Sequence, residues 1–104
     1  ESTLLFRRNW PGLDRRELRA FARRLRLEVG EGRPFTCLMT GDRALQTLNR
    51  QFLGHDYPTD VLSFPSASPG GELGELAISL DRAAAQAAER GHALEDELRI
   101  LMLH

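Results

Sequence analysis

The sequence predicts an α+β domain in which a small mixed four-stranded sheet packs against helices, in the order β-α-β-α-β-β-α-α. Three observations support this fold class. The chain has 104 residues, a length that fits one compact domain. Its composition, 41% hydrophobic and 28% charged, is that of an ordinary globular protein. Short apolar runs alternate with longer segments of helical periodicity. We therefore expect residues 1–104 to belong to a single domain.

The first strand and helix come before residue 30. An apolar run at residues 4–6 suits a strand. A helix follows from Asp14, which can cap it, and Glu17 stands three residues later, where it completes a capping box. Apolar residues then recur at helical spacing as far as Val29, so one face of this helix is expected to be buried.

The middle of the chain predicts three more strands and a second helix. Residues 35–40, 61–64 and 76–80 are short apolar runs next to Pro or Gly, which favours strands. The second helix opens at Asp42 and closes at Gly54, because glycine is the usual residue after a helix.

Two further helices complete the predicted order. Asp81 can cap the third helix, which runs to Arg90 and is expected to turn Ala84, Ala85 and Ala88 toward the sheet. The fourth helix starts near residue 94 with three acids in its first turn, where the helix dipole favours negative charge. Its apolar periodicity continues to the last residue, so we expect the domain to be incomplete at the C-terminus.

The charged residues are unevenly distributed. All 14 basic residues are arginine, and residues 1–50 hold 11 of them against 6 acids, whereas residues 51–104 hold 3 against 9. The first helix carries an arginine face, and like charges at i, i+4 destabilise a helix unless a partner compensates them. This face predicts binding to a polyanion such as RNA. Its candidate contact residues are Arg15, Arg19, Arg23 and Arg26.

Composition also excludes several kinds of protein. No apolar run approaches the roughly 20 residues that span a bilayer, so we expect no membrane partner and a cytoplasmic location. Cys37 is the only cysteine, which rules out an internal disulfide and a cysteine-based zinc site within the chain. It is expected to pack as a small core residue.

Two sequence stretches carry a family resemblance. Residues 48–65 read LNRQFLGHDYPTDVLSFP, and residues 73–80 read LGELAISL. In residue type, order and spacing they resemble the YbeY family, whose members are metal-dependent endoribonucleases of ribosomal RNA maturation and ribosome quality control. The PTDVLSFP octamer at residues 58–65 is the specific part of the match.

The resemblance implies a zinc site. The family motif H-G-x-x-H-x-x-G-x-x-H supplies three histidines to one zinc ion, and such a metal lowers the pKa of a bound water so that it can attack a phosphodiester. His104 matches the first of the three, and the other two fall beyond the chain. The resemblance therefore implies one Zn per complete protein, which this chain alone would not retain, leaving it inactive by itself.

Other candidate site residues follow from the same match. The family has an arginine at the position of Leu53, and Arg50, one helical turn earlier, is the candidate to replace it. His92, after a helix-ending glycine, is expected to serve structure. The remaining candidates are His55, Asp60 and Ser63 for RNA and Glu75 for a partner.

Three functions stay open at this point. The first is a zinc-dependent single-strand endoribonuclease whose partners are ribosomal RNA and the ribosome or small-subunit proteins. The second is a non-catalytic RNA- or ribosome-binding module, which the leucine at position 53 favours. The third is a metallohydrolase with a substrate other than RNA.

Overall fold

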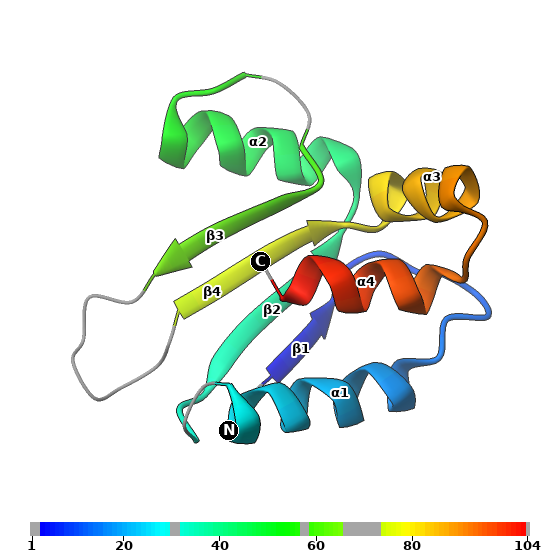
Figure 1. Cartoon of the computed structure of the whole chain (residues 1–104). Helices are drawn as coiled ribbons and strands as arrows, with labels where there is room; N and C mark the ends of the chain where they lie inside the picture. The colour runs from blue at the N-terminus through cyan, green and yellow to red at the C-terminus, as the bar shows by residue number, and fades with distance from the viewer. Residues whose placement is uncertain (1–2, 30–31, 57–58, 66–73, 104) are drawn as a thin grey trace.

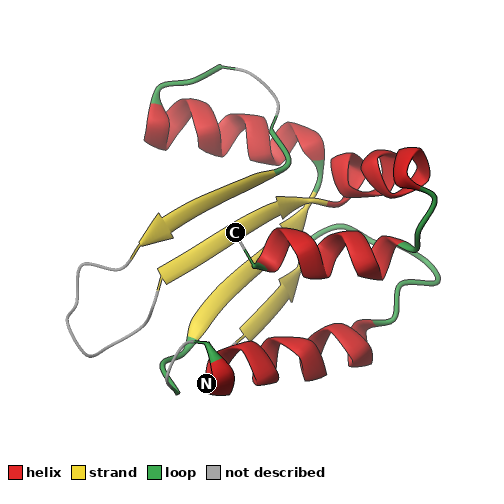
Figure 2. Ribbon diagram, viewed as in Figure 1, coloured by secondary structure: helices red, strands yellow, loops and turns green. Residues whose placement is uncertain are grey.

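We describe the chain from a computed structural model, which covers residues 3–29, 32–56, 59–65 and 74–103. A four-stranded sheet and four helices form an α+β fold, as predicted, in the predicted order (Figures 1 and 2). The strands are β1 (Thr3–Phe6), β2 (Phe35–Thr40), β3 (Val61–Pro65) and β4 (Gly74–Ser79), and the helices are α1 (Arg15–Glu28), α2 (Asp42–Leu53), α3 (Leu80–Arg90) and α4 (Leu94–Met102).

The sheet is mixed, with the strand order β1-β2-β4-β3. β1 and β4 both run parallel to the central strand β2, and β3 pairs antiparallel with β4 at the other edge. Side chains alternate between the two faces along each strand. One row of paired residues therefore lies on one face (Leu5, Leu38, Ala77, Leu62) and the next row on the other (Phe6, Met39, Ile78, Val61).

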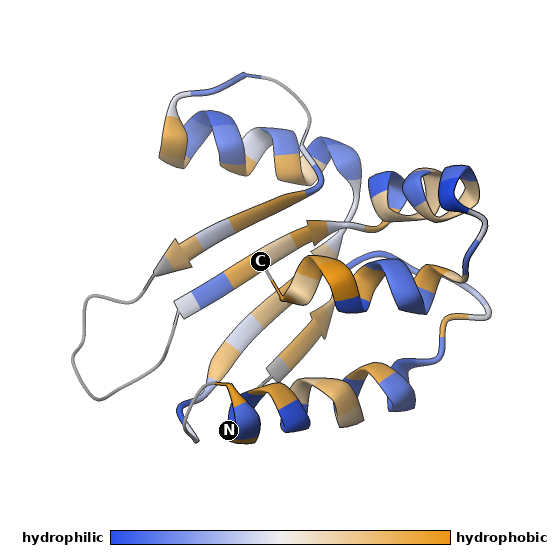
Figure 3. Ribbon diagram, in the orientation of Figure 1, coloured by the Kyte–Doolittle hydropathy of each residue, from blue (hydrophilic) through white to orange (hydrophobic). Residues whose placement is uncertain are grey.

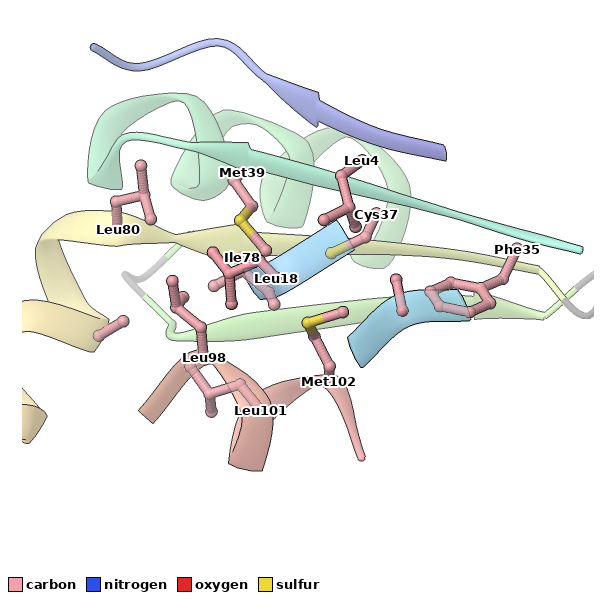
Figure 4. Close-up of a cluster of buried hydrophobic side chains, with 12 residues drawn as sticks. Leu4, Leu18, Phe35, Cys37, Met39, Ile78, Leu80, Leu98, Leu101 and Met102 are labelled. Carbon is pink, nitrogen blue, oxygen red and sulfur yellow. The ribbon is translucent and has the colours of Figure 1, made fainter. Parts of the chain in front are cut away.

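Helices cover both faces. α1 and α4 lie side by side over one face, and the larger core cluster fills the space between them and the strands (Figures 1 and 4). α2 covers the opposite face, where a smaller cluster is built on Leu45, Leu62 and Ala77. Apolar and polar residues alternate along the helices (Figure 3), and the buried residues are Leu18 and Ala22 in α1 and Leu45 and Asn49 in α2. α2 and α4 therefore lie on opposite faces of the sheet.

The first helix confirms half of its predicted capping box. The Asp14 side chain accepts a hydrogen bond from the Glu17 backbone N–H at 3.0 Å. In a full capping box the Glu17 side chain would accept a hydrogen bond from the Asp14 backbone N–H. This N–H donates instead to Glu95 Oε2 of α4 at 2.8 Å. Glu17 pairs with Arg99 of α4 instead. Capping and ion pairing thus join α1 to α4.

The third helix starts earlier than predicted. Ser79 is its N-cap, and the Ser79 side chain accepts from the Arg82 backbone N–H at 3.2 Å, so β4 ends at Ser79 rather than at residue 80. Asp81 was expected in this role. Its carboxylate instead accepts from the Asp42 backbone N–H, the first residue of α2, at 2.8 Å, and from Arg8 at 2.9 Å.

The buried face of α3 is the side that carries Leu80. Leu80 is fully buried, and positions three and seven residues later share its side of the helix. Ala83 and Ala87 are therefore buried against the rest of the protein, whereas the predicted Ala85 and Ala88 are exposed. Ala84 is half-buried, so the predicted alanine face is wrong at Ala85 and Ala88, because the side of α3 that carries Leu80, Ala83 and Ala87 is the one that packs against the protein.

Two helix ends also differ from prediction. α1 ends at Glu28, and Val29, expected in its apolar stripe, is 68% exposed. α4 ends at Met102, with Leu103 as its C-cap, although the periodicity predicted a helix running to His104. No helix in the described part of the chain has both the length and the apolar character needed to cross a membrane.

Candidate functional site

The helix that leads to the predicted metal ligand is firmly packed. Leu98, Leu101 and Met102 of α4 are buried in the larger core cluster (Figure 4). His104 itself lies outside the described residues. Because α1 and β4 also contact α4, the last turn of this helix has a fixed place on one face of the sheet.

A buried carboxylate anchors the start of the same helix. Glu97 is fully buried, and its carboxylate accepts from Arg90 Nη1 at 2.9 and 3.2 Å. The Nε2 atom of His92 lies 2.7 Å from Glu97 Oε1. His92 thus serves structure, as predicted, because it ties the α3–α4 corner to α4. The acids in the first turn of α4 predict where the helix starts, but they do not predict that Glu97 is buried.

The candidates at the end of α2 lie on the other side of the sheet. Arg50 is exposed in the last turn of α2, and Leu53 at the helix end is 46% exposed. Gly54 takes the left-handed conformation with φ 73°, and the His55 backbone N–H then donates to the Asn49 carbonyl at 3.3 Å. Arg50 and His55 are close to each other along the chain, but the sheet separates α2 from α4.

Two candidates sit on β3 or at its start. The Asp60 carbonyl accepts from the Ser79 backbone N–H at 2.9 Å, and Asp60 Oδ2 accepts from Gln86 of α3 at 3.2 Å. Asp60 therefore holds the entry of β3 to α3. Ser63 is exposed, and its register partner Leu76 belongs to the face that α4 covers. Of the residues predicted around position 60, Ser63 is the one that shares a face with α4.

Glu75 lines a groove that the sequence did not indicate. The groove lies between α2 and the sheet and has a volume of about 480 Å³. Most of its lining is apolar, and Phe52 meets Phe64 edge to face with the ring centroids 5.7 Å apart. Arg7 also lines this groove. The aromatic pair arises because α2 and β3 place these two rings together, which no local pattern predicts.

The arginine face of α1 is divided into different environments. Arg15 and Arg19 both stack on the ring of Phe6 in β1, whereas Arg23 is exposed. Arg26 donates from Nε to the Gly32 carbonyl at 2.8 Å and so holds the turn after the helix. The four predicted contact residues are therefore not equivalent.

The described residues do not form a metal site. Within them, no three side chains of His, Cys, Asp or Glu gather closely enough to hold a metal ion. His104, the residue that matches a ligand of the zinc centre implied by the family resemblance, lies outside the described part of the chain.

The fold and these positions first define a class of protein, a small α+β domain with an arginine-rich helix and the motif residues on the edge strand β3. Residues 13–104 match the family model described as Endoribonuclease YbeY. The chain belongs to this family.

Individual relatives agree with that assignment. The chain is 57% identical over 103 residues to "Endoribonuclease YbeY" of Solibacter usitatus, covering 99% of this chain and 69% of the relative. It is 42% identical over 101 residues to the protein of the same name from Koribacter versatilis, covering 97% of this chain and 66% of that one. With "Endoribonuclease YBEY, chloroplastic" of Arabidopsis thaliana it shares 44% identity over 72 residues, which are 64% of this chain and 12% of that protein.

A solved structure supports the fold. The solution structure of TM1509 from Thermotoga maritima matches with a TM-score of 0.64 and 24% sequence identity, covering 91% of this chain and 63% of that one. At this level of identity the similarity supports the fold alone. The chain spans about two thirds of the length of the bacterial relatives described above.

Proposed function

We propose that the protein is a zinc-dependent endoribonuclease that cleaves single-stranded RNA during ribosomal RNA processing, maturation and ribosome quality control. The observation that carries the proposal is the 57% identity to a relative named Endoribonuclease YbeY over nearly the whole chain. The uncompensated arginines of α1 support a polyanionic substrate, since RNA binding gains from release of counterions by cationic side chains.

The proposed zinc ion is implied by the family motif and not by the described residues. His104 would be one ligand, as the residue that matches the first histidine of the family motif. When bound by three protein nitrogens, zinc supplies a water of lowered pKa for attack on a phosphodiester. The described residues would contribute the placement of α4, which Glu97, Leu98 and Leu101 hold in the core.

The proposed partners are ribosomal RNA and the ribosome or its small-subunit proteins, and the proposed location is the cytoplasm. Arg50, His55, Asp60 and Ser63 stay candidates for RNA contact, and Glu75 stays a candidate for contact with a partner. Ser63 has the best position among them for RNA near the end of α4, because it is exposed on the face that α4 covers.

A non-catalytic RNA- or ribosome-binding module is the second candidate function. Leu53 replaces the family arginine, and its proposed substitute Arg50 lies on a helix that covers the opposite sheet face from α4. A metallohydrolase with another substrate is the third, and it shares the metal but not the RNA.

One experiment separates the three functions. The full-length natural protein is incubated with labelled single-stranded ribosomal RNA with and without a chelator, and its zinc content is measured; His104→Ala is the matched variant. RNA cleavage that needs both zinc and His104 supports the endoribonuclease. Tight RNA binding without cleavage favours the binding module, and bound zinc with neither cleavage nor RNA binding favours another substrate.

A further inference from the structure

Four arginines in the described part of the chain pair with a carboxylate. Arg90 pairs with the buried Glu97, and Arg99 pairs with both Glu17 and Asp96. Arg8 and Arg82 bond to Asp81 and Asp42. These contacts neutralise the guanidinium groups, which are then poor candidates for binding an anion.

Arg15 and Arg19 contact an aromatic ring instead of a carboxylate. The guanidinium carbon of Arg15 lies 4.6 Å from the centre of the Phe6 ring, and that of Arg19 lies 5.1 Å from the same centre. Among the described residues, no carboxylate pairs with either side chain. Two positive charges are therefore held near one ring with no acid to compensate them.

The ring fixes both groups without using their hydrogen-bond donors. A cation held over an aromatic ring is attracted by the ring's electrons and not through a hydrogen bond, so the N–H groups of both guanidinium groups stay available to another partner. Phe6 is itself half-buried and packs against the larger core cluster, which gives the stack a rigid base. The two planar forks can therefore meet a phosphate with little loss of side-chain freedom.

Resting on the RNA substrate proposed above, we propose that Arg15 and Arg19, stacked on Phe6, bind a phosphodiester group of single-stranded RNA. We call these three residues the arginine clamp. Glu17 lies two residues from each arginine, on another side of α1, and pairs there with Arg99 of α4. The clamp thus faces away from α4, and its role is to hold RNA rather than to act on the cleaved bond.

The test compares two double variants of the full-length natural protein. Arg15→Gln with Arg19→Gln removes the clamp, and Arg16→Gln with Arg24→Gln removes the same charge from exposed positions of the same helix. Affinity for a fluorescently labelled single-stranded RNA is measured by anisotropy at several salt concentrations. We expect about tenfold weaker binding for the clamp variant and a clearly smaller effect for the control.

The salt dependence and a third variant sharpen the result. Loss of one phosphate contact reduces the slope of log K against log salt by about 0.7 for a single strand. Phe6→Leu keeps both arginines and an apolar side chain but removes the ring, so it should weaken RNA binding more than the charge control does. Thermal melting of each variant shows whether it is folded.

Three outcomes would overturn the clamp. Equal binding by the clamp and control variants, with wild-type protein binding RNA normally, rejects the clamp and leaves the proposed function intact. Wild-type protein that binds no RNA rejects both. Poly-glutamate that displaces RNA from wild type but not from the clamp variant, at a carboxylate concentration equal to the RNA phosphate concentration, would show that the clamp takes an acidic chain instead.

Discussion

Arg90 Nη1 lies 2.9 Å from Oε2 of Glu97, a carboxylate that is fully buried. Arg90 itself is about half exposed, so the pair reaches from solvent into the corner between α3 and α4. From the same corner, His92 Nε2 contacts the other carboxylate oxygen of Glu97, Oε1, at 2.7 Å. A buried carboxylate is tolerated only when hydrogen bonds and charge compensate its loss of water, and these two residues do so here.

We therefore expect Glu97→Ala to destabilise the protein by about 2 kcal/mol. The substitution leaves a polar cavity at the start of α4, while Arg90 and His92 can still reach water, which keeps the loss below that of a fully buried pair. Urea unfolding followed by circular dichroism measures the change. Glu89→Ala, an exposed acid on α3, is the control and should change stability little. Equal effects of the two variants would contradict the role of Glu97.

The Asp81 carboxylate gives the fold a dependence on pH. The hydrogen bond from the Asp42 backbone N–H, followed by the contact with Arg8, lowers the pKa of Asp81 below its usual 3.8, against an opposing effect of burial. A carboxyl whose pKa is lower in the folded state stabilises the fold above its unfolded pKa, and this contribution is lost as the pH falls through the folded pKa.

Asp81→Asn should accordingly lower stability at pH 7 by about 1 kcal/mol or less, because water screens a side chain that is one third exposed. The difference from wild type should shrink once the pH drops below 3.8. Urea unfolding at neutral and acidic pH measures it, with Glu89→Gln as the control. A difference that stays constant as the pH falls to the acidic range would rule out this linkage.

The elements were predictable because their signals are local. The apolar spacing of α1 and the short runs of β2 and β3 lie within single segments, and the structure confirms their positions. Partner choice is not local. The Asp14 N–H bonds to Glu95, which is 81 residues away, although Glu17 stands at the position that the capping pattern favours.

The candidate site was predictable only in part for the same reason. The motif stretch indicated the family, and Ser63 lies on the face that α4 covers. Sequence spacing placed Arg50 one turn from Leu53 but held no information on which face of the sheet α2 covers. The stack of Arg15 and Arg19 on Phe6 likewise depends on how α1 docks against β1.

The single cysteine should be inert in the folded protein. Cys37 is fully buried in the central strand, and burial raises its pKa to about 12. The reactive thiolate is therefore nearly absent at neutral pH. Ellman's reagent at pH 8 should label no thiol in the native protein and one per chain in guanidinium chloride. Rapid labelling of the native protein would show that the core around β2 opens readily.

Arg50 tests whether the surface of α2 takes part in RNA binding. It is exposed near the helix end, on the sheet face opposite α4, so it can contact RNA but does not share a face with the helix leading to His104. Arg50→Gln should then raise KM for RNA cleavage about fivefold, as expected for loss of an exposed charged contact, while kcat stays unchanged.

The matched control for this prediction is Arg43→Gln, which removes an exposed arginine from the first turn of the same helix. The two variants carry the same net charge, so a larger KM effect at Arg50 reports position rather than overall electrostatic attraction. A fall in kcat for Arg50→Gln would mean that this arginine acts at the cleaved bond in place of the family arginine missing at Leu53. Identical kinetics of both variants and wild type would remove α2 from the RNA-binding surface.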